Sequence, residues 1–253
     1  FEYKWRPSDK KRFNFKLIDL EFVNNKNIEN YFNVYRNSYD RLNTIANKFR
    51  LSDNYYDEND NLIIPFGTNL FIENFENNLI STLTEDEQAA LRSISERRNR
   101  LTVNNLILGS SLSLNYDNQE NLLDEDFYQL RWKIEWVGNL LNSFLKTTSE
   151  KNIYGNYEIN GVTPSQYIKT DIDLIKHVSV GRDRIFAFRF FSGLALPVGN
   201  STNIPFSRSY FAGGANDNRA WKAYKLGPGT SDNNNEFNEA NLKISMNMEY
   251  RFP

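Results

Sequence analysis

The fold is decided most clearly by residues 128–136, which read YQLRWKIEW. Apolar or aromatic side chains alternate with polar ones along this stretch, and a β-strand places successive side chains on opposite faces. Trp132 and Trp136 therefore share one face, whereas Arg131 and Lys133 share the other. An aromatic face opposite a charged face is typical of a strand that separates lipid from a polar lumen.

The same alternation returns at the end of the sequence, where residues 242–252 read LKISMNMEYRF. Apolar residues occupy every second position over about ten residues, which is the length that a tilted strand needs to cross a hydrocarbon core. Extended to the whole chain, the pattern predicts seven strands, near residues 1–7, 12–24, 100–117, 127–141, 165–178, 184–197 and 240–253. The phase shifts between Leu17 and Ile18, which predicts a β-bulge.

The connections between these strands alternate in length. Residues 7–11, 117–126 and 179–183 are short, whereas residues 25–99, 142–164 and 198–239 are long. Short periplasmic turns and long extracellular loops are the pattern of outer-membrane barrels. We therefore expect an all-β, antiparallel transmembrane β-barrel, of which residues 1–253 form a part. Since seven strands leave unpaired edges, which are costly in lipid, we expect missing strands on both sides.

Orientation follows from the alternation. We expect lipid-facing side chains at Trp132, Trp136, Phe188, Phe190, Ile244 and Met246. We expect lumen-facing side chains at Arg131, Lys133, Lys169, Asp171, Arg189 and Lys243.

Composition excludes several classes of protein. The net charge of -2 gives no basic footprint for nucleic acid. No apolar run approaches the length of a transmembrane helix, and the absence of cysteine excludes disulfides and thiolate chemistry. The aromatic content of 15% fits the aromatic girdles of a membrane barrel.

The first long loop, residues 25–99, has helical periodicity near residues 28–49, 69–79 and 84–98. Thr84 and Glu87 have the spacing of a capping box. We expect this insertion to form a folded, partly helical extracellular cap over the barrel. The alternative is a surface for docking a partner.

The sequence gives little support for a catalytic site or a metal site. His177 is the only histidine and lies near a turn, and the sequence has no Gly-x-Ser-x-Gly elbow, so we expect no enzyme. Asp171 and Asp173 form either lumen ion pairs or an acid pair. The acidic residues 53–60 lack the glycine and terminal glutamate of a calcium-binding EF-hand. We expect no cofactor and no metal.

Residues 204–221 read IPFSRSYFAGGANDNRAW and resemble the sixth extracellular loop of the BamA/TamA family of outer-membrane assembly factors, also called the bacterial surface antigen family. That loop has a phenylalanine and paired glycines, here Gly213 and Gly214, followed by an aliphatic-Arg-Gly-aromatic motif. The motif reads Asn218, Arg219, Ala220 and Trp221 in this sequence, so its aliphatic and glycine positions depart from the family. Residues 226–229 and 247–253 also resemble the family, the former as in TamA-like lipoproteins of Bacteroidota.

The resemblance implies a 16-stranded barrel in which the loop 198–239 folds back into the lumen as a plug. It also implies that Arg219 meets acidic residues on the inner wall, because a guanidinium that leaves water needs a carboxylate partner. Glu249 is the local candidate, whereas the family's main acidic partner lies on the following strand.

By the same resemblance we expect an assembly factor in the outer membrane of a Gram-negative bacterium. It inserts precursor barrels without ATP, by strand pairing at an exposed sheet edge. The expected partners are outer-membrane lipids and lipopolysaccharide, unfolded outer-membrane proteins and other assembly-complex subunits, but no nucleic acid. The alternative is an outer-membrane channel or a protein-secretion pore plugged by the same loop.

Overall fold

The computed structural model describes residues 1–80, 82–148, 151, 157–159, 162–215, 217–227 and 239–252. The described residues divide into two compact units. The sheet unit contains residues 1–23, 104–226 and 239–252, and the helical unit contains residues 24–103. Asn216, Pro228, Gly229 and Pro253, which belong to the quoted motifs, lie outside the described residues.

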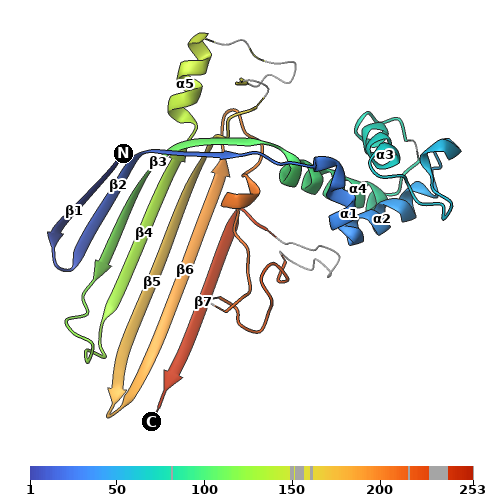
Figure 1. Ribbon diagram of the computed structural model, residues 1–253. Coiled ribbons are helices and arrows are strands. Elements are labelled where there is room, and N and C mark those ends of the chain that lie inside the picture. The colour runs from blue at the N-terminus through green and yellow to red at the C-terminus, as the bar shows by residue number, and fades with distance from the viewer. Residues whose placement is uncertain are drawn as a thin grey trace. The chain divides into compact units, whose positions relative to one another are not determined.

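The sheet unit holds one antiparallel sheet in which every strand pairs with its neighbour in sequence (Figure 1). Its strands are β1 (Glu2–Ser8), β2 (Lys11–Val23), β3 (Asn105–Asp117), β4 (Tyr128–Val137), β5 (Tyr167–Gly181), β6 (Arg184–Pro197) and β7 (Leu242–Arg251). The sheet is not closed, because β1 and β7 each pair with one neighbour. The prediction of about seven antiparallel strands in a partial barrel is therefore confirmed at this level.

Two predicted strand boundaries were wrong. The third strand begins at Asn105 instead of near residue 100, because the preceding helix runs on to Thr102. The fourth strand ends at Val137 instead of near residue 141, because Gly138 turns the chain with a φ of 78°. A helix that the sequence analysis did not predict, α5 (Asn139–Thr148), follows this turn.

The bulge predicted in the second strand is present. The pairing of β2 with β3 shifts register between Lys16 and Asp19. Before the shift Phe15 pairs with Leu112, and after it Leu20 pairs with Leu108. Because the extra residue resets the alternation, apolar side chains stay on one face of the sheet along the whole strand.

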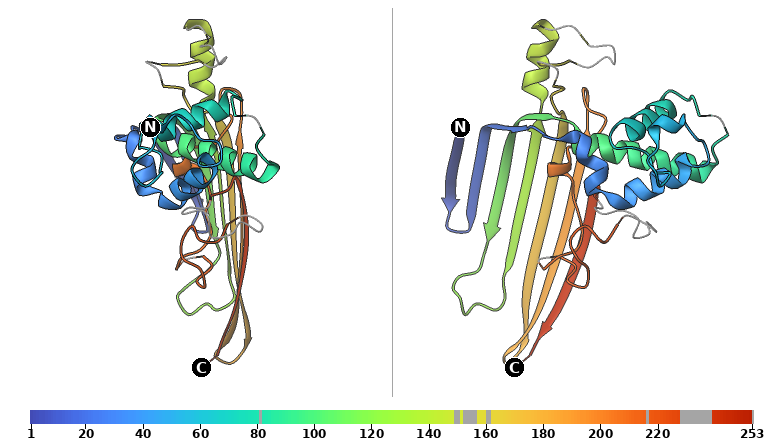
Figure 2. Two further views of the ribbon diagram at one scale, coloured as in Figure 1. Left: turned by 90° about the vertical axis from the view of Figure 1, so that its right-hand side faces the viewer. Right: turned by 45° about the vertical axis from the view of Figure 1, so that its right-hand side comes forward.

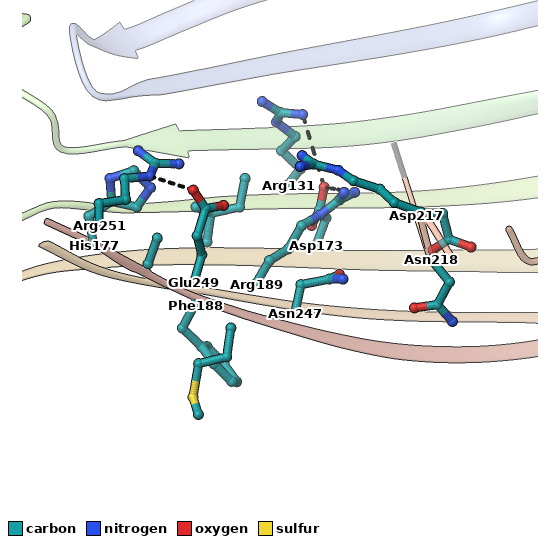
Figure 3. Close-up of a pocket in the computed structure, with 14 residues that line it drawn as sticks. Arg131, Asp173, His177, Phe188, Arg189, Asp217, Asn218, Asn247, Glu249 and Arg251 are labelled. Carbon is teal, nitrogen blue, oxygen red and sulfur yellow. Dashed lines mark hydrogen bonds and ion pairs between the residues drawn. The ribbon is translucent and has the colours of Figure 1, made fainter. Parts of the chain in front are cut away.

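The two faces of the sheet differ sharply in exposure. On the apolar face Ile244 is 61% exposed and Met248 is 67% exposed. On the polar face Glu135 is only 7% exposed. Figure 3 shows the alternation on one strand, where Phe188 points away from the side that carries Arg189.

Short turns join the strands at one end of the sheet, where two residues, Asp9 and Lys10, link β1 to β2 and two others, Arg182 and Asp183, link β5 to β6. The turn between β3 and β4, residues 118–127, lies at the same end (Figure 1). The three long connections leave from the opposite end, as the alternation of loop lengths predicted.

The helical unit contains η1 (Ile28–Asn30), α1 (Tyr31–Val34), α2 (Arg36–Ala46), η2 (Asp53–Tyr55), α3 (Phe66–Glu76) and α4 (Glu85–Thr102). The predicted capping box starts α4: the Thr84 hydroxyl accepts from the Glu87 N–H, and the Glu87 carboxylate accepts from the Thr84 N–H. Phe32, Leu42, Phe71 and Leu91 are buried in its own apolar core. Helices thus occupy the predicted segments, while an extracellular cap stays a prediction.

Three of the acidic residues within 53–60 of the helical unit have partners in the chain itself. The Arg50 guanidinium lies 3.1 Å from the Asp53 carboxylate and 2.8 Å from that of Asp60. Asp57 accepts backbone hydrogen bonds from Asn59 and Asn61. These carboxylates therefore have protein partners.

Within the described part of the chain, every helix is too short or too polar to cross a bilayer.

Candidate functional site

The connection from β6 to β7 packs against the polar face of the sheet. Seen edge-on, the sheet carries this loop on one side (Figure 2, left). Tyr210 and Ala240 exchange backbone hydrogen bonds of 2.9 and 2.8 Å, which join the beginning of the loop to its end. Ala212 and Leu226 form a second isolated bridge inside it. The described part of the loop is therefore folded, and we call residues 204–226 the inner loop.

Arg208 joins the inner loop to two strands. It ends the short helix η3 (Phe206–Arg208). Its guanidinium lies 2.5 Å from the Glu21 carboxylate on β2 and 3.9 Å from that of Glu135 on β4. Its carbonyl oxygen accepts a 2.9 Å hydrogen bond from Lys169 on β5. A buried carboxylate such as Glu135 needs a cation beside it, and Arg208 shares that role with Lys133.

Tyr210 fits into a gap that a glycine leaves in the wall. A Cβ atom built at Gly193 on β6 would come within 2.5 Å of the Tyr210 ring. The Tyr210 hydroxyl donates to the carboxylate of Asp171, which pairs directly with Gly193, and the Lys169 ammonium lies 4.3 Å from the ring centroid. Burial first, and then the bond to Asp171, raise the pKa of Tyr210. The tyrosine therefore remains a protonated donor.

Asp217 makes the third anchor of the inner loop. Its carboxylate accepts a 2.8 Å bond from the Gly213 N–H and lies 2.9 Å from the Lys243 ammonium on β7. Lys243 also donates to the Phe211 carbonyl at 2.9 Å. Burial opposes ionisation of Asp217, but the bonds from Lys243 and Gly213 outweigh it and lower its pKa.

The paired glycines of the motif have a local reason. Gly213 and Gly214 adopt φ angles of 95° and 101°, which residues with a side chain rarely adopt. A Cβ at Gly213 would also overlap the Lys222 carbonyl. The Gly214 N–H donates to the Trp221 carbonyl at 2.8 Å, which closes the turn around residues 214–221.

A groove of about 770 Å³ lies between the inner loop and the lower half of the polar face (Figure 3). Within it Asp173 on β5 accepts two bonds from Arg189 on β6, Nε at 2.8 Å and Nη2 at 3.1 Å. Arg131 on β4 approaches the same carboxylate at 4.0 Å. Three adjacent strands are thus tied by one carboxylate, and Asp173 acts as an ion-pair partner.

Arg219 lies beside the same groove but forms a different contact from the one that the resemblance implies. Its Nε donates to the Ala215 carbonyl at 3.2 Å, and among the described residues its guanidinium forms no ion pair. Glu249 also lines the groove, and its carboxylate pairs with Arg251 at 2.9 Å. The expected direct pair between Arg219 and Glu249 is therefore absent from this structure.

The departures from the family motif are accommodated. Among the described non-glycine residues with positive φ, Ala220 does not occur, so its backbone does not require a glycine. The Asn218 backbone carbonyl accepts a 3.1 Å hydrogen bond from the Trp221 N–H, and the Trp221 side chain is exposed.

The other site residues from the sequence analysis lie on the expected faces of the pairing register. Lys133 pairs with Asp171, and Trp132 pairs with Ile172, so charged and apolar neighbours stay on opposite faces. Phe188 and Phe190 pair with Met248 and Met246, and Trp136 pairs with Ile168 on the same apolar face. Whether the apolar face meets lipid stays a prediction.

Sequence reasoning missed Arg208, Tyr210 and Asp217 as anchors, although all three lie in the quoted segment. A signal for Arg208 existed: Glu21 and Glu135 both fall on polar positions of their strands and require a cation. Gly193, which interrupts an otherwise bulky strand, was the signal for an inserted ring.

Comparison with family models identifies the superfamily to which this sheet and its inner loop belong. The model of the Omp85 superfamily domain matches residues 6–253, which include all of the inner loop and the sheet from the middle of β1 onward. A search of curated proteins gave no match. Because the match spans nearly the whole sequence, the chain belongs to the Omp85 superfamily, whose members are outer-membrane proteins.

Proposed function

We propose that the protein is an outer-membrane β-barrel assembly factor that inserts precursor proteins without ATP. The superfamily is one of outer-membrane protein insertion and secretion. One observation carries the proposal: the inner loop is fixed to the polar face by Arg208, Tyr210 and Asp217, while the opposite apolar face is exposed. This arrangement suits a barrel wall in a bacterial outer membrane, with lipid outside and the loop inside.

The proposed mechanism uses the sheet itself. An unpaired strand edge presents N–H and C=O groups that pair with an incoming strand. A loop held by three anchors keeps polar groups on the inner side of the wall. The client's backbone finds no hydrogen-bond partners in lipid, so it gains its bonds at the strand edge. The proposed partners are outer-membrane lipids and lipopolysaccharide, unfolded outer-membrane proteins and other subunits of an assembly complex. We propose no catalytic residue, since templated pairing breaks no covalent bond.

The alternative is a channel or secretion pore that the inner loop plugs. The groove of about 770 Å³ beside Arg219 favours this alternative, since it leaves polar space along the wall. In that case, removal of the loop increases ion flow, whereas an assembly factor shows its main effect on clients.

The test is reconstitution of the protein in liposomes free of nucleotide, followed by addition of a urea-unfolded eight-stranded outer-membrane protein. Folding of the client is measured by protease protection and by heat-dependent gel mobility. We expect faster client folding than in empty liposomes, and a loss of that acceleration when residues 204–226 are replaced by a short linker. Ion conductance measured on the same liposomes identifies a channel. A large conductance without any acceleration of client folding contradicts the assembly proposal and supports the alternative.

A further inference from the structure

The turn between β3 and β4 exposes two neighbouring leucines almost completely. Leu122 is 97% exposed and Leu123 is 89% exposed. A single exposed leucine is ordinary, because apolar atoms supply much of any protein surface. Two adjacent leucines at the tip of a turn form a small contiguous apolar patch. Exposed apolar patches are a common property of interaction sites.

The turn is braced by its own side chains. The Asp124 carboxylate accepts 3.1 Å bonds from the N–H groups of Glu120 and Asp126. The Asn121 side chain accepts a 2.8 Å bond from the Leu123 N–H. These are the local bonds by which Asx residues fix turns. A surface that is ordered before binding loses less conformational entropy when it binds, so the brace favours recognition.

The position of the leucines points away from the membrane. Tyr116 and Tyr128 stack at 5.1 Å between ring centroids at the base of the turn, on the apolar face. In the proposed barrel, such an aromatic pair lies in the girdle at the membrane interface. The turn continues past this pair and carries Glu120, Asp124, Glu125 and Asp126 around the leucines. Carboxylates are poorly accommodated among lipid headgroups, several of which are anionic themselves.

The charges around the two leucines indicate which kind of partner would bind this turn. A hollow of about 550 Å³ lies beside Leu123, and its charged lining residues are three carboxylates, Glu120, Asp124 and Asp126, and one ammonium, Lys10. Within the described part of the turn, Glu120 pairs with Lys10 and Asp126 with Lys176, while Asp124 and Glu125 form no ion pair. We propose that this turn docks a basic amphipathic helix of a protein partner, whose apolar side covers Leu122 and Leu123 and whose lysines or arginines face the carboxylates of the turn. The proposal rests on the proposed barrel orientation but does not depend on the assembly function.

The experiment uses the absence of cysteine from the sequence. Leu122→Cys carries an environment-sensitive bimane dye, and the protein is placed in phosphatidylcholine nanodiscs. The matched control is Leu140→Cys, whose residue is 67% exposed on α5 at the other end of the sheet. The probe is an amphipathic helical peptide of lysine and leucine. Two comparison peptides replace its lysines by glutamate or its leucines by serine.

We expect a saturable blue shift of the dye at position 122 with the lysine–leucine peptide alone. The double charge reversal Glu120→Lys with Glu125→Lys weakens that binding about tenfold, because the rim charges then repel the peptide. Leu123→Ser weakens it as well, because Leu122 is already replaced by the labelled cysteine and this change removes the remaining leucine of the pair.

Four results overturn the proposal. They are no response at position 122, an equal response to the glutamate peptide, an equal response of the control dye at position 140, and a blue shift with phosphatidylcholine or phosphatidylglycerol vesicles in the absence of peptide. The last of these assigns the leucines to the membrane surface instead of a protein.

Discussion

The helical unit and the sheet unit distribute their apolar side chains in opposite ways. In the helical unit Phe32 and Leu42 are buried and the charges lie outside. In the sheet unit Ile244 and Met248 are exposed on one face, whereas the other face buries Glu135 and Asp173 together with a small apolar cluster around Tyr167. One chain therefore contains a unit with an apolar core and a sheet whose covered face carries charged side chains.

The difference teaches that burial alone does not identify a core. The mean hydropathy of the chain, -0.64, averages over both regions and describes neither. The relevant question is which medium each face meets. A helical unit that meets water on all sides must hide its apolar residues, whereas an alternating strand in lipid exposes them. Each of the following substitutions tests one side of this contrast.

The largest effect is expected in the core of the helical unit. Phe71→Ala removes a ring that is fully buried, and should lower the free energy of unfolding of this unit by about 3–5 kcal/mol. Hydrogen exchange of residues 24–103, followed in the intact protein, measures the loss. Leu79→Ala in the same unit is the control, because that side chain is exposed and its removal should change stability by about 0.5 kcal/mol or less. Similar losses for both variants would show that this unit lacks a water-excluding core.

The next effect concerns the apolar face of the sheet. Ile244→Arg should cost about 2–4 kcal/mol of folding free energy in a bilayer if that face meets lipid near its midplane. Ser245→Arg, one residue further along β7, is the matched control and should be mild, because it points to the polar face. Urea titration of folding into phospholipid vesicles measures both. Equal costs, or a larger cost for Ser245→Arg, would contradict the assignment of the faces.

Arg208→Ala tests whether the covered charges on the polar face hold the loop. It leaves Glu135 buried with Lys133 as its remaining partner, and should cost about 1–3 kcal/mol. Arg208→Lys should recover part of this, since an ammonium reaches one carboxylate but not the forked geometry. Limited proteolysis within residues 204–226 reports release of the loop. Lys222→Ala, at an exposed position of the same loop, should leave the cleavage rate unchanged.

A smaller effect is expected from acid. Because the folded state lowers the pKa of Asp217, its contribution to stability is fully present above the ordinary pKa of 3.8 and is lost as the pH falls through the lower folded pKa. The bond to Lys243 is partly exposed to solvent, so we expect a loss below about 1 kcal/mol. Motion of a spin label at residue 215, measured between pH 6 and pH 2, should increase only in the acid range. Asp217→Asn should be mobile at every pH, and an unchanged acid response in that variant would assign the effect to another group.

The smallest change in loop stability is expected for Arg219→Ala. The Arg219 side chain is exposed and bonds to one backbone carbonyl, so its loss should cost about 0.5 kcal/mol. The same proteolysis assay measures it beside Arg208→Ala. An effect as large as that of Arg208→Ala would indicate a carboxylate partner of Arg219 beyond the described residues, as the resemblance implies. Arg219→Lys would then restore only part of the protection.

The strands were predictable because alternation is a local property of the sequence. The run from Tyr128 to Trp136 fixed one strand and its faces, and the phase shift after Leu17 located a bulge. The helix α5 was not predicted, since its ten residues were assigned to a strand end and to a loop. Short segments of apolar residues are ambiguous in this way, because helix and strand periods differ little over few residues.

The site was predictable in part. The segment that carries it was identified, yet the anchoring residues depend on which strand each loop residue reaches. Arg208 meets residues 187 and 73 positions away in sequence, on β2 and β4. No local sequence pattern contains such contacts. The motif spacing therefore predicted Arg219 as the anchor, whereas the sheet geometry shows that Arg208 is the one that pairs with the wall. Ala220 illustrates the same limit, since only the backbone angle shows that a glycine is not needed there.

The contact between Gly193 and Tyr210 also constrains how this protein can evolve. Any residue with a Cβ at position 193 collides with the tyrosine ring, and any smaller residue at position 210 leaves a void above the glycine. The two positions are therefore coupled: a change at either one alone disturbs this contact, whereas a bulky residue at 193 with a small one at 210 can restore it. Homologous sequences should show a ring at one position only where the other is glycine. A library randomised at both codons and selected for function should return that pair, or a bulky residue at position 193 with a small one at position 210, and should lack the mixed combinations.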